Sequence, residues 1–119
     1  MKALSIRQPW AHAILHLGKD VENRTWSTNY QGLIVVHAPK TVDRDAVAHL
    51  RECGYDIPDP LVTGALVGTV YVTGCFPSRS GWAVDGQYHW WLEDPLPLPV
   101  PIPWALEFFE VPDEVLARW

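Results

Sequence analysis

Apolar and polar positions alternate over residues 3–6 and then change to a helical spacing. The alternation predicts a short strand. Pro9 suits the first turn of a helix, where its missing N–H has no intrahelical partner to lose. Trp10 and Ile14 would share one face of that helix, and Gly18 stands where helices are commonly capped. The pattern therefore predicts a strand followed by a helix that ends near Gly18.

The chain beyond Gly18 is polar and predicts an extended segment from Lys19 to Trp26. Side chains of a strand alternate between its two faces. Lys19 and Asn23 would then face one way, and Glu22 and Arg24 the other. We therefore expect Glu22 and Arg24 to be neighbours on one face, where they could form an ion pair.

Three later segments carry clear periodic signals. A continuous apolar run over residues 33–38 predicts a buried strand. Apolar residues recur at helical spacing between Val42 and Cys53, with Gly54 after the end, which predicts a helix. Residues 65–76 are rich in valine and threonine and predict a long central strand.

The aromatic stretch 88–92 predicts a shorter strand, in which Trp90 and Trp91 must face opposite ways, and 77–87 predicts an exposed loop. Prolines at every second position of 95–103 argue against a central strand and predict a polyproline-type connection across the end of a barrel. A last strand is expected over 105–111 and a short helical end over 113–119.

Five or six short strands with two helices among them predict an α+β fold, a small, mostly antiparallel β-barrel with two inserted or flanking helices. The 119 residues suit one domain, 1–119, with a core of its own. Two cysteines are too few for a disulfide scaffold, and no segment resembles a membrane span or signal peptide. A cytoplasmic location without membrane association is therefore expected.

The histidines are scattered, and no cysteine spacing is typical of zinc sites, so neither a metal nor another cofactor is expected. His12 and His16 stand one helical turn apart, a spacing more typical of a solvated helix face. The formal net charge of −5 argues against strong binding to a long duplex. Basic residues nevertheless gather in the first forty positions, which favours one basic face and a compact ligand.

Four motifs together resemble the ASCH domain family: residues 4–11, 18–26, 30–32 and 64–68. The resemblance implies a PUA-like barrel and involvement with RNA or other nucleic acid. It also implies open alternatives, because some members resemble binding modules, one bacterial branch is an amidohydrolase acting on acetylated cytidine, and another member has been described as a ribonuclease. The expected partner is thus RNA, DNA or a modified nucleoside.

The binding hypothesis assigns phosphate contacts to basic side chains, hydrogen bonds to a base or sugar to Ser5 and Gln8, and stacking on an unpaired base to Trp10 or Trp26. Trp10 also suits the core, and Trp82, Trp90, Trp91 and Trp104 could either line a pocket for a flat base or fill the core. The predicted nucleic-acid site comprises Ser5, Arg7, Gln8, Lys19, Glu22, Arg24, Trp26, His37 and Lys40.

A hydrolase is the alternative, with Lys19, Glu22 and His37 as catalytic candidates. The amidohydrolase branch uses a lysine, a threonine three positions later and a glutamate on a later strand. Lys19 matches that lysine, but Glu22 occupies the threonine's position and residues 65–76 hold no carboxylate. That mechanism does not transfer, which leaves Lys19 beside Glu22 with His37 as a base. A third alternative is a protein-interaction domain that uses the proline-rich segment.

Overall fold

A computed structural model describes residues 1–105 of the chain. The strand expected over 105–111, apart from Ala105, which lies in no strand, and the helix expected over 113–119 fall outside the described residues. The described elements are, in order, β1 (Ala3–Ser5), α1 (Trp10–His16), β2 (Val21–Arg24), β3 (Gly32–Ala38), α2 (Arg44–Glu52), β4 (Ala65–Cys75) and β5 (Tyr88–Pro103). Each strand and helix predicted within residues 1–92 is thus confirmed in type. The ends shift by a few residues, except that the strand predicted over 88–92 continues to Pro103.

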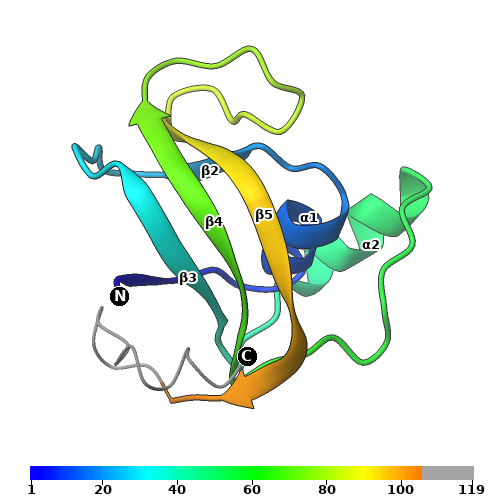
Figure 1. Ribbon diagram of the computed structural model, residues 1–119. Helices are drawn as coiled ribbons and strands as arrows, with labels where there is room; N and C mark the ends of the chain where they lie inside the picture. Colours follow the sequence, from blue (N-terminus) through cyan, green and yellow to red (C-terminus); the bar gives the residue numbers. More distant parts are fainter. Residues whose placement is uncertain (106–119) are drawn as a thin grey trace.

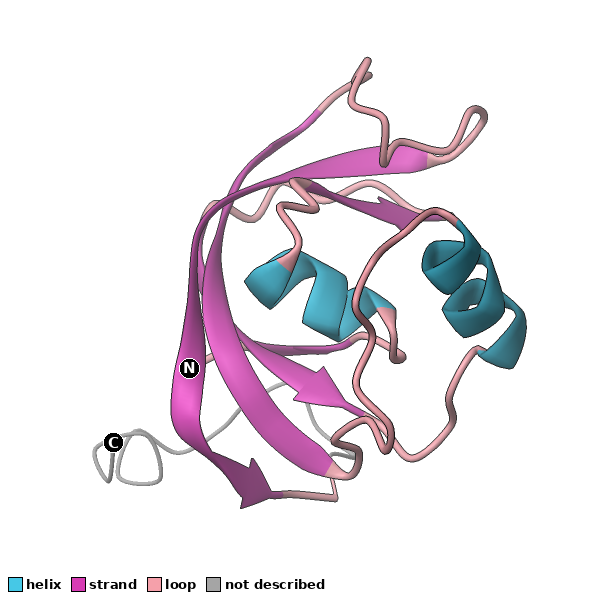
Figure 2. Cartoon of the chain, turned by 90° about the vertical axis from the view of Figure 1, so that its right-hand side faces the viewer, coloured by secondary structure: helices cyan, strands magenta, loops and turns pink. Residues whose placement is uncertain are grey.

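The strands form one mixed sheet in the order β1-β3-β4-β5-β2. β1 and β3 pair in parallel, and the other three pairs are antiparallel. The sheet curls into a half-barrel around α1, and α2 lies further out on the same side (Figure 2). The α+β prediction is therefore confirmed, with β1 and β2 as the two edges of an open half-barrel (Figure 1).

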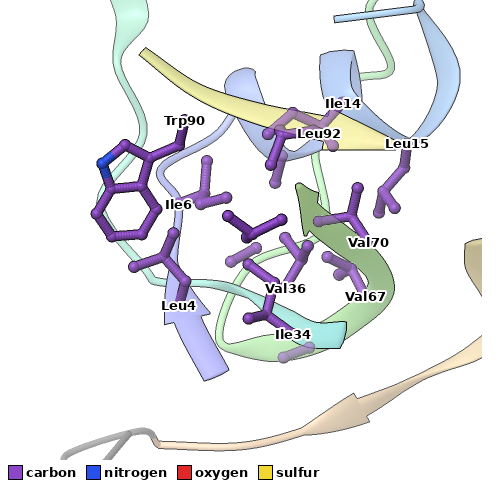
Figure 3. Packing of buried hydrophobic residues seen from close by; sticks show 14 residues of the cluster. Leu4, Ile6, Ile14, Leu15, Ile34, Val36, Val67, Val70, Trp90 and Leu92 are labelled. Carbon is purple, nitrogen blue, oxygen red and sulfur yellow. The ribbon is translucent and has the colours of Figure 1, made fainter. Parts of the chain in front are cut away.

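The main core fills the concave side of the sheet. Side chains from β1, α1, β3, β4 and β5 converge there, and Figure 3 shows Ile6, Ile14, Val36 and Val70 among them. Gly68 permits this close approach, because a Cβ at that position would lie 2.6 Å from Leu15 Cδ2 and 2.7 Å from the Leu96 carbonyl oxygen. Helix α1 is thereby seated against β4 and holds the N-terminal part of the chain in place.

Helix ends follow the expected local chemistry. Gly18 has a φ of +78°, a backbone conformation that favours glycine, and it follows the end of α1. Asp43 precedes α2, and its side chain accepts a hydrogen bond of 3.1 Å from the Ala46 N–H. Neither helix of the described part of the chain is long and apolar enough to cross a membrane.

The prediction of a polyproline-type connection over 95–103 is wrong. This segment continues β5, and β4 pairs with it at Pro97 and Pro103. β2 pairs only with Tyr88–Trp91, so within residues 1–105 the remainder of β5 has one edge without a neighbouring strand. Proline is tolerated there because its missing N–H removes no sheet hydrogen bond on a free edge. The protein-interaction alternative depended on a separate proline-rich segment, and this segment is instead part of strand β5.

Candidate functional site

A cavity of about 820 Å³ opens beside the concave side of the half-barrel. Its walls come from the end of β1, the start of α1, β2, the end of α2 and the loop between β4 and β5. Residues far apart in the sequence meet here only because the sheet curls. Five of the nine residues of the predicted site line it: Ser5, Arg7, Lys19, Glu22 and Arg24.

A buried ionic network forms one wall of the cavity. Lys19 Nζ donates hydrogen bonds of 2.6 Å to the Val21 carbonyl oxygen and 3.0 Å to Glu22 Oε1. Arg24 Nη2 lies 2.8 Å from Glu22 Oε2, so the predicted pairing of Glu22 with Arg24 is confirmed. One carboxylate therefore lies between two cationic side chains, and the network carries a net positive charge when Lys19 is protonated.

Strict strand alternation predicted that Lys19 lies on the side opposite Glu22. The structure instead places the two side chains together. The reason is that β2 begins at Val21, so the alternation does not extend back to Lys19. Burial lowers the pKa of Lys19 below its ordinary value of 10.5, the nearby charge and hydrogen bond of Glu22 partly oppose this, and Arg24 lowers it further. Lys19 is thus a buried amine that gives up its proton more readily than a solvated lysine.

Arg24 connects this network to the opposite edge of the sheet. Its Nη2 donates a 2.6 Å hydrogen bond to the Ser5 carbonyl oxygen. Its Nε is buried without a hydrogen-bond partner among the described residues, although buried N–H groups normally have one. The Trp26 ring lies 5.3 Å from Arg24 Cζ and covers the guanidinium from outside.

The rim of the cavity combines a free cation with aromatic rings. The exposed Arg7 guanidinium has no hydrogen bond or ion pair with any residue of 1–105. Trp10 is half-buried, and its ring centroid lies 5.7 Å from Lys19 Nζ. Trp82 is also half-buried and lines the cavity, whereas Trp90 is buried in the core. The cavity therefore offers apolar ring surface together with unpaired positive charge.

Four predicted site residues do not line this cavity. Gln8 is buried, accepts a hydrogen bond from the His12 N–H and donates one to the Val62 carbonyl oxygen. Lys40 is exposed beside Gly64, and Trp26 reaches the site only through Arg24. Gln8 thus has a structural role here, and Lys40 and Trp26 are peripheral to the cavity.

His37 is the fourth of these residues. Its Nε2 lies 2.9 Å from the Trp104 carbonyl oxygen and its Nδ1 lies 2.8 Å from Ser5 Oγ. Because a carbonyl oxygen only accepts, Nε2 carries a proton, and Nδ1 shares a hydrogen bond with the Ser5 hydroxyl. His37 does not line the cavity, and both ring nitrogens of this buried histidine already have hydrogen-bond partners, which does not favour the general-base role.

Several cavity residues were not among the predicted site residues. Asn23 belongs to β2, and the others come from the irregular loop before β5 and from the end of α2 and the residues after it. The clearest of these others are His49, Cys53, Tyr55 and Trp82. Only the tryptophan content of the second half indicated Trp82 beforehand. Within residues 1–105, no group of three or more His, Cys, Asp and Glu side chains could hold a metal ion.

The family model of the ASCH domain matches residues 4–98, from β1 into the second half of β5. The chain belongs to the ASCH domain family. The matched region contains every residue that lines the cavity, so the site lies within the part of the chain that defines this ASCH domain. Comparison with curated proteins found no match. The open, curled sheet agrees with the PUA-like fold of the family.

Proposed function

We propose that this ASCH domain binds an unpaired or modified nucleotide of an RNA strand in the cavity. The observation that carries the proposal is the meeting of Arg7, Lys19 and Arg24 with the rings of Trp10 and Trp82 around one cavity of about 820 Å³. Pockets for small ligands have volumes of roughly 300–1,000 Å³. The space suits one base with its sugar and phosphate rather than a duplex.

Each side chain has a distinct role in this proposal. Arg7, which is exposed and unpaired within residues 1–105, contacts a phosphate at the rim. The aromatic walls stack on the base, a contact worth roughly 1–3 kcal/mol per base. Arg24 and protonated Lys19, which line the cavity, attract oxygen atoms on the base by their positive charge. Glu22 holds both cations in place, since each of its oxygens already has a partner.

The overall charge supports a compact ligand. A formal net charge of −5 repels a long polyanion, and only the local cationic groups of the cavity favour binding. A nucleotide that inserts into the cavity is attracted by those groups while the rest of the strand makes few phosphate contacts. We therefore expect a shallow dependence of affinity on salt concentration.

Titration of the protein with short single-stranded RNA, single-stranded DNA and duplex DNA at two salt concentrations tests the proposal. We expect salt-sensitive binding to the single strands, with RNA preferred. Arg7→Ala should weaken binding and reduce the salt slope by about one phosphate contact. Arg44→Ala is the matched control, because Arg44 is an exposed arginine of α2 that does not line the cavity. Equal effects of the two substitutions, or no binding to any strand, would contradict the proposal.

Hydrolysis of a modified nucleoside is a second candidate, supported by the lowered pKa of Lys19 beside a carboxylate in the cavity. Such an amine could donate or accept a proton during attack on a carbonyl or phosphate. Mass spectrometry of the same RNA strands, and of acetylated cytidine, after incubation with the protein tests it. Turnover by the wild-type protein that is lost in Lys19→Met would show that the protein is an enzyme. If the substrates stay intact with the wild-type protein, binding remains the only proposed function.

A further inference from the structure

The loop between β4 and β5, residues 76–87, forms one side of the cavity. It arches away from the sheet at the top of Figure 1. Its residues Gly81, Trp82, Ala83, Val84 and Gln87 all line the cavity. A loop of this length has few backbone hydrogen bonds of its own to fix its position, so side chains of other elements must hold it.

Asn23 of β2 holds the loop by both ends of its amide group. Its Nδ2 donates a 2.9 Å hydrogen bond to the Trp82 carbonyl oxygen, and its Oδ1 accepts a 2.9 Å hydrogen bond from the Val84 N–H. These two bonds bracket Ala83 and fix the backbone directly after Trp82. Only a side chain with both a donor and an acceptor can make them together, which is why an amide serves here and a carboxylate does not.

Further contacts fix the two flanks of the same loop. His89 Nδ1 accepts from the Ser78 N–H at 2.9 Å, and Nε2 donates to the Val84 carbonyl oxygen at 2.7 Å. The Trp82 ring lies 5.4 Å from that of Tyr55 and packs against the small apolar cluster of Val47, Leu50 and Ile57. The loop is therefore attached on both sides of Trp82. At Trp82 itself, Asn23 holds the carbonyl oxygen, and Ser80 Oγ, which donates to Asp20 Oδ1, accepts a 3.2 Å hydrogen bond from the N–H.

We propose that Asn23 is the positioning residue for Trp82, which it holds as the aromatic wall on which a planar base stacks. The inference rests on the proposed function. It assigns selectivity for planar ligands to the loop 76–87, which the alternation of apolar and polar residues in the sequence does not identify as part of a site. The amide of Asn23 itself is occupied by the loop and acts through Trp82. Neighbouring Arg24 supplies positive charge to the cavity and Glu22 holds its guanidinium, so one short strand arranges both kinds of recognition.

A double-mutant cycle tests the coupling, with the single-stranded RNA titration as readout. Trp82→Ala should weaken binding about tenfold, the effect of losing one stacked base. Asn23→Ala should weaken it by a similar factor, mainly by faster dissociation, with the salt slope unchanged because no phosphate contact is lost. The double variant should bind no more weakly than Trp82→Ala alone. Additive losses would overturn the proposal.

A structural readout separates this inference from the proposed function. Amide hydrogen exchange at Val84 should accelerate in Asn23→Ala and stay unchanged in Asn29→Ala, since Asn29 is an exposed asparagine that does not line the cavity. In Asn23→Asp the carboxylate can still accept from the Val84 N–H and slow its exchange, but it cannot donate to the Trp82 carbonyl oxygen. We therefore expect this variant to bind RNA with an affinity between those of wild type and Asn23→Ala. Unchanged Val84 exchange in Asn23→Ala overturns the positioning role. If the wild-type protein binds no nucleic acid, the proposed function fails, and the exchange rates still decide whether Asn23 holds the loop.

Discussion

The guanidinium of Arg24 donates a 2.6 Å hydrogen bond to the backbone carbonyl oxygen of Ser5. Ser5 ends β1 and Arg24 ends β2, and these two strands are the opposite edges of the sheet. A single side chain thus links the two edges of the half-barrel, beside the cavity that both residues line. The same guanidinium also pairs with Glu22, which couples the link to the buried ionic network.

Arg24→Lys should lower the free energy of unfolding by about 1–3 kcal/mol, because an ammonium cannot reproduce the planar guanidinium that reaches both Ser5 and Glu22. Urea unfolding of the two proteins measures the difference. Arg44→Lys, an exposed change on α2, should leave the midpoint unchanged. Equal midpoints for wild type and Arg24→Lys would show that the link between the edges does not contribute to stability.

Lys19 should make stability rise with pH in the alkaline range. Burial lowers its pKa in the folded protein, while the unfolded chain keeps the ordinary value of 10.5. Between those two values the unfolded state binds the proton more tightly, so the free energy of unfolding increases with pH; below the folded value both states hold the proton and the slope vanishes. Urea unfolding from about pH 7 to about pH 10 should show wild type gaining stability relative to Lys19→Met. A constant difference would contradict the lowered pKa.

Gly68→Ala should be strongly destabilising, because its Cβ would meet Leu15 Cδ2 at 2.6 Å and the Leu96 carbonyl oxygen at 2.7 Å. Overpacking of this kind costs about 1–3 kcal/mol. Gly81→Ala is the matched control, since a Cβ there meets nothing within 4 Å. Thermal unfolding of both variants compares them directly. Similar melting temperatures would mean that α1 can move away from β4 at little cost.

His37→Ala should reduce stability without reducing nucleotide affinity. The change leaves Ser5 Oγ and the Trp104 carbonyl oxygen without their partner, which costs roughly 1–3 kcal/mol for a buried site. Because His37 does not line the cavity and both of its ring nitrogens already have partners, the folded variant should bind RNA within about twofold of wild type, a difference of less than about 0.5 kcal/mol. A loss of RNA affinity as large as that in Arg7→Ala would show that His37 contributes to the binding site.

Hydrophobic periodicity predicted most of the fold because each signal is local. The buried run ending at Ala38, the helical spacing after Val42 and the long strand after Gly64 all depend on neighbours within one element. The proline run of β5 was interpreted wrongly for the opposite reason. Whether proline disrupts a strand depends on whether a partner strand needs its N–H. Among the described residues, the short length of β2 leaves that edge of β5 without a neighbouring strand.

The sequence by itself determined the elements, the family resemblance and the pairing of Glu22 with Arg24, since all of these rest on residues close together in the chain. The tertiary structure decided which side chains share a cavity. Curling of the sheet brings Arg7 and Lys19 close to Trp82, which lies more than sixty residues later in the sequence. Gln8 and His37 do not line the cavity and instead form hydrogen bonds with buried backbone and side-chain groups. Spacing along a chain specifies neighbours within an element, whereas contacts between elements depend on how those elements pack.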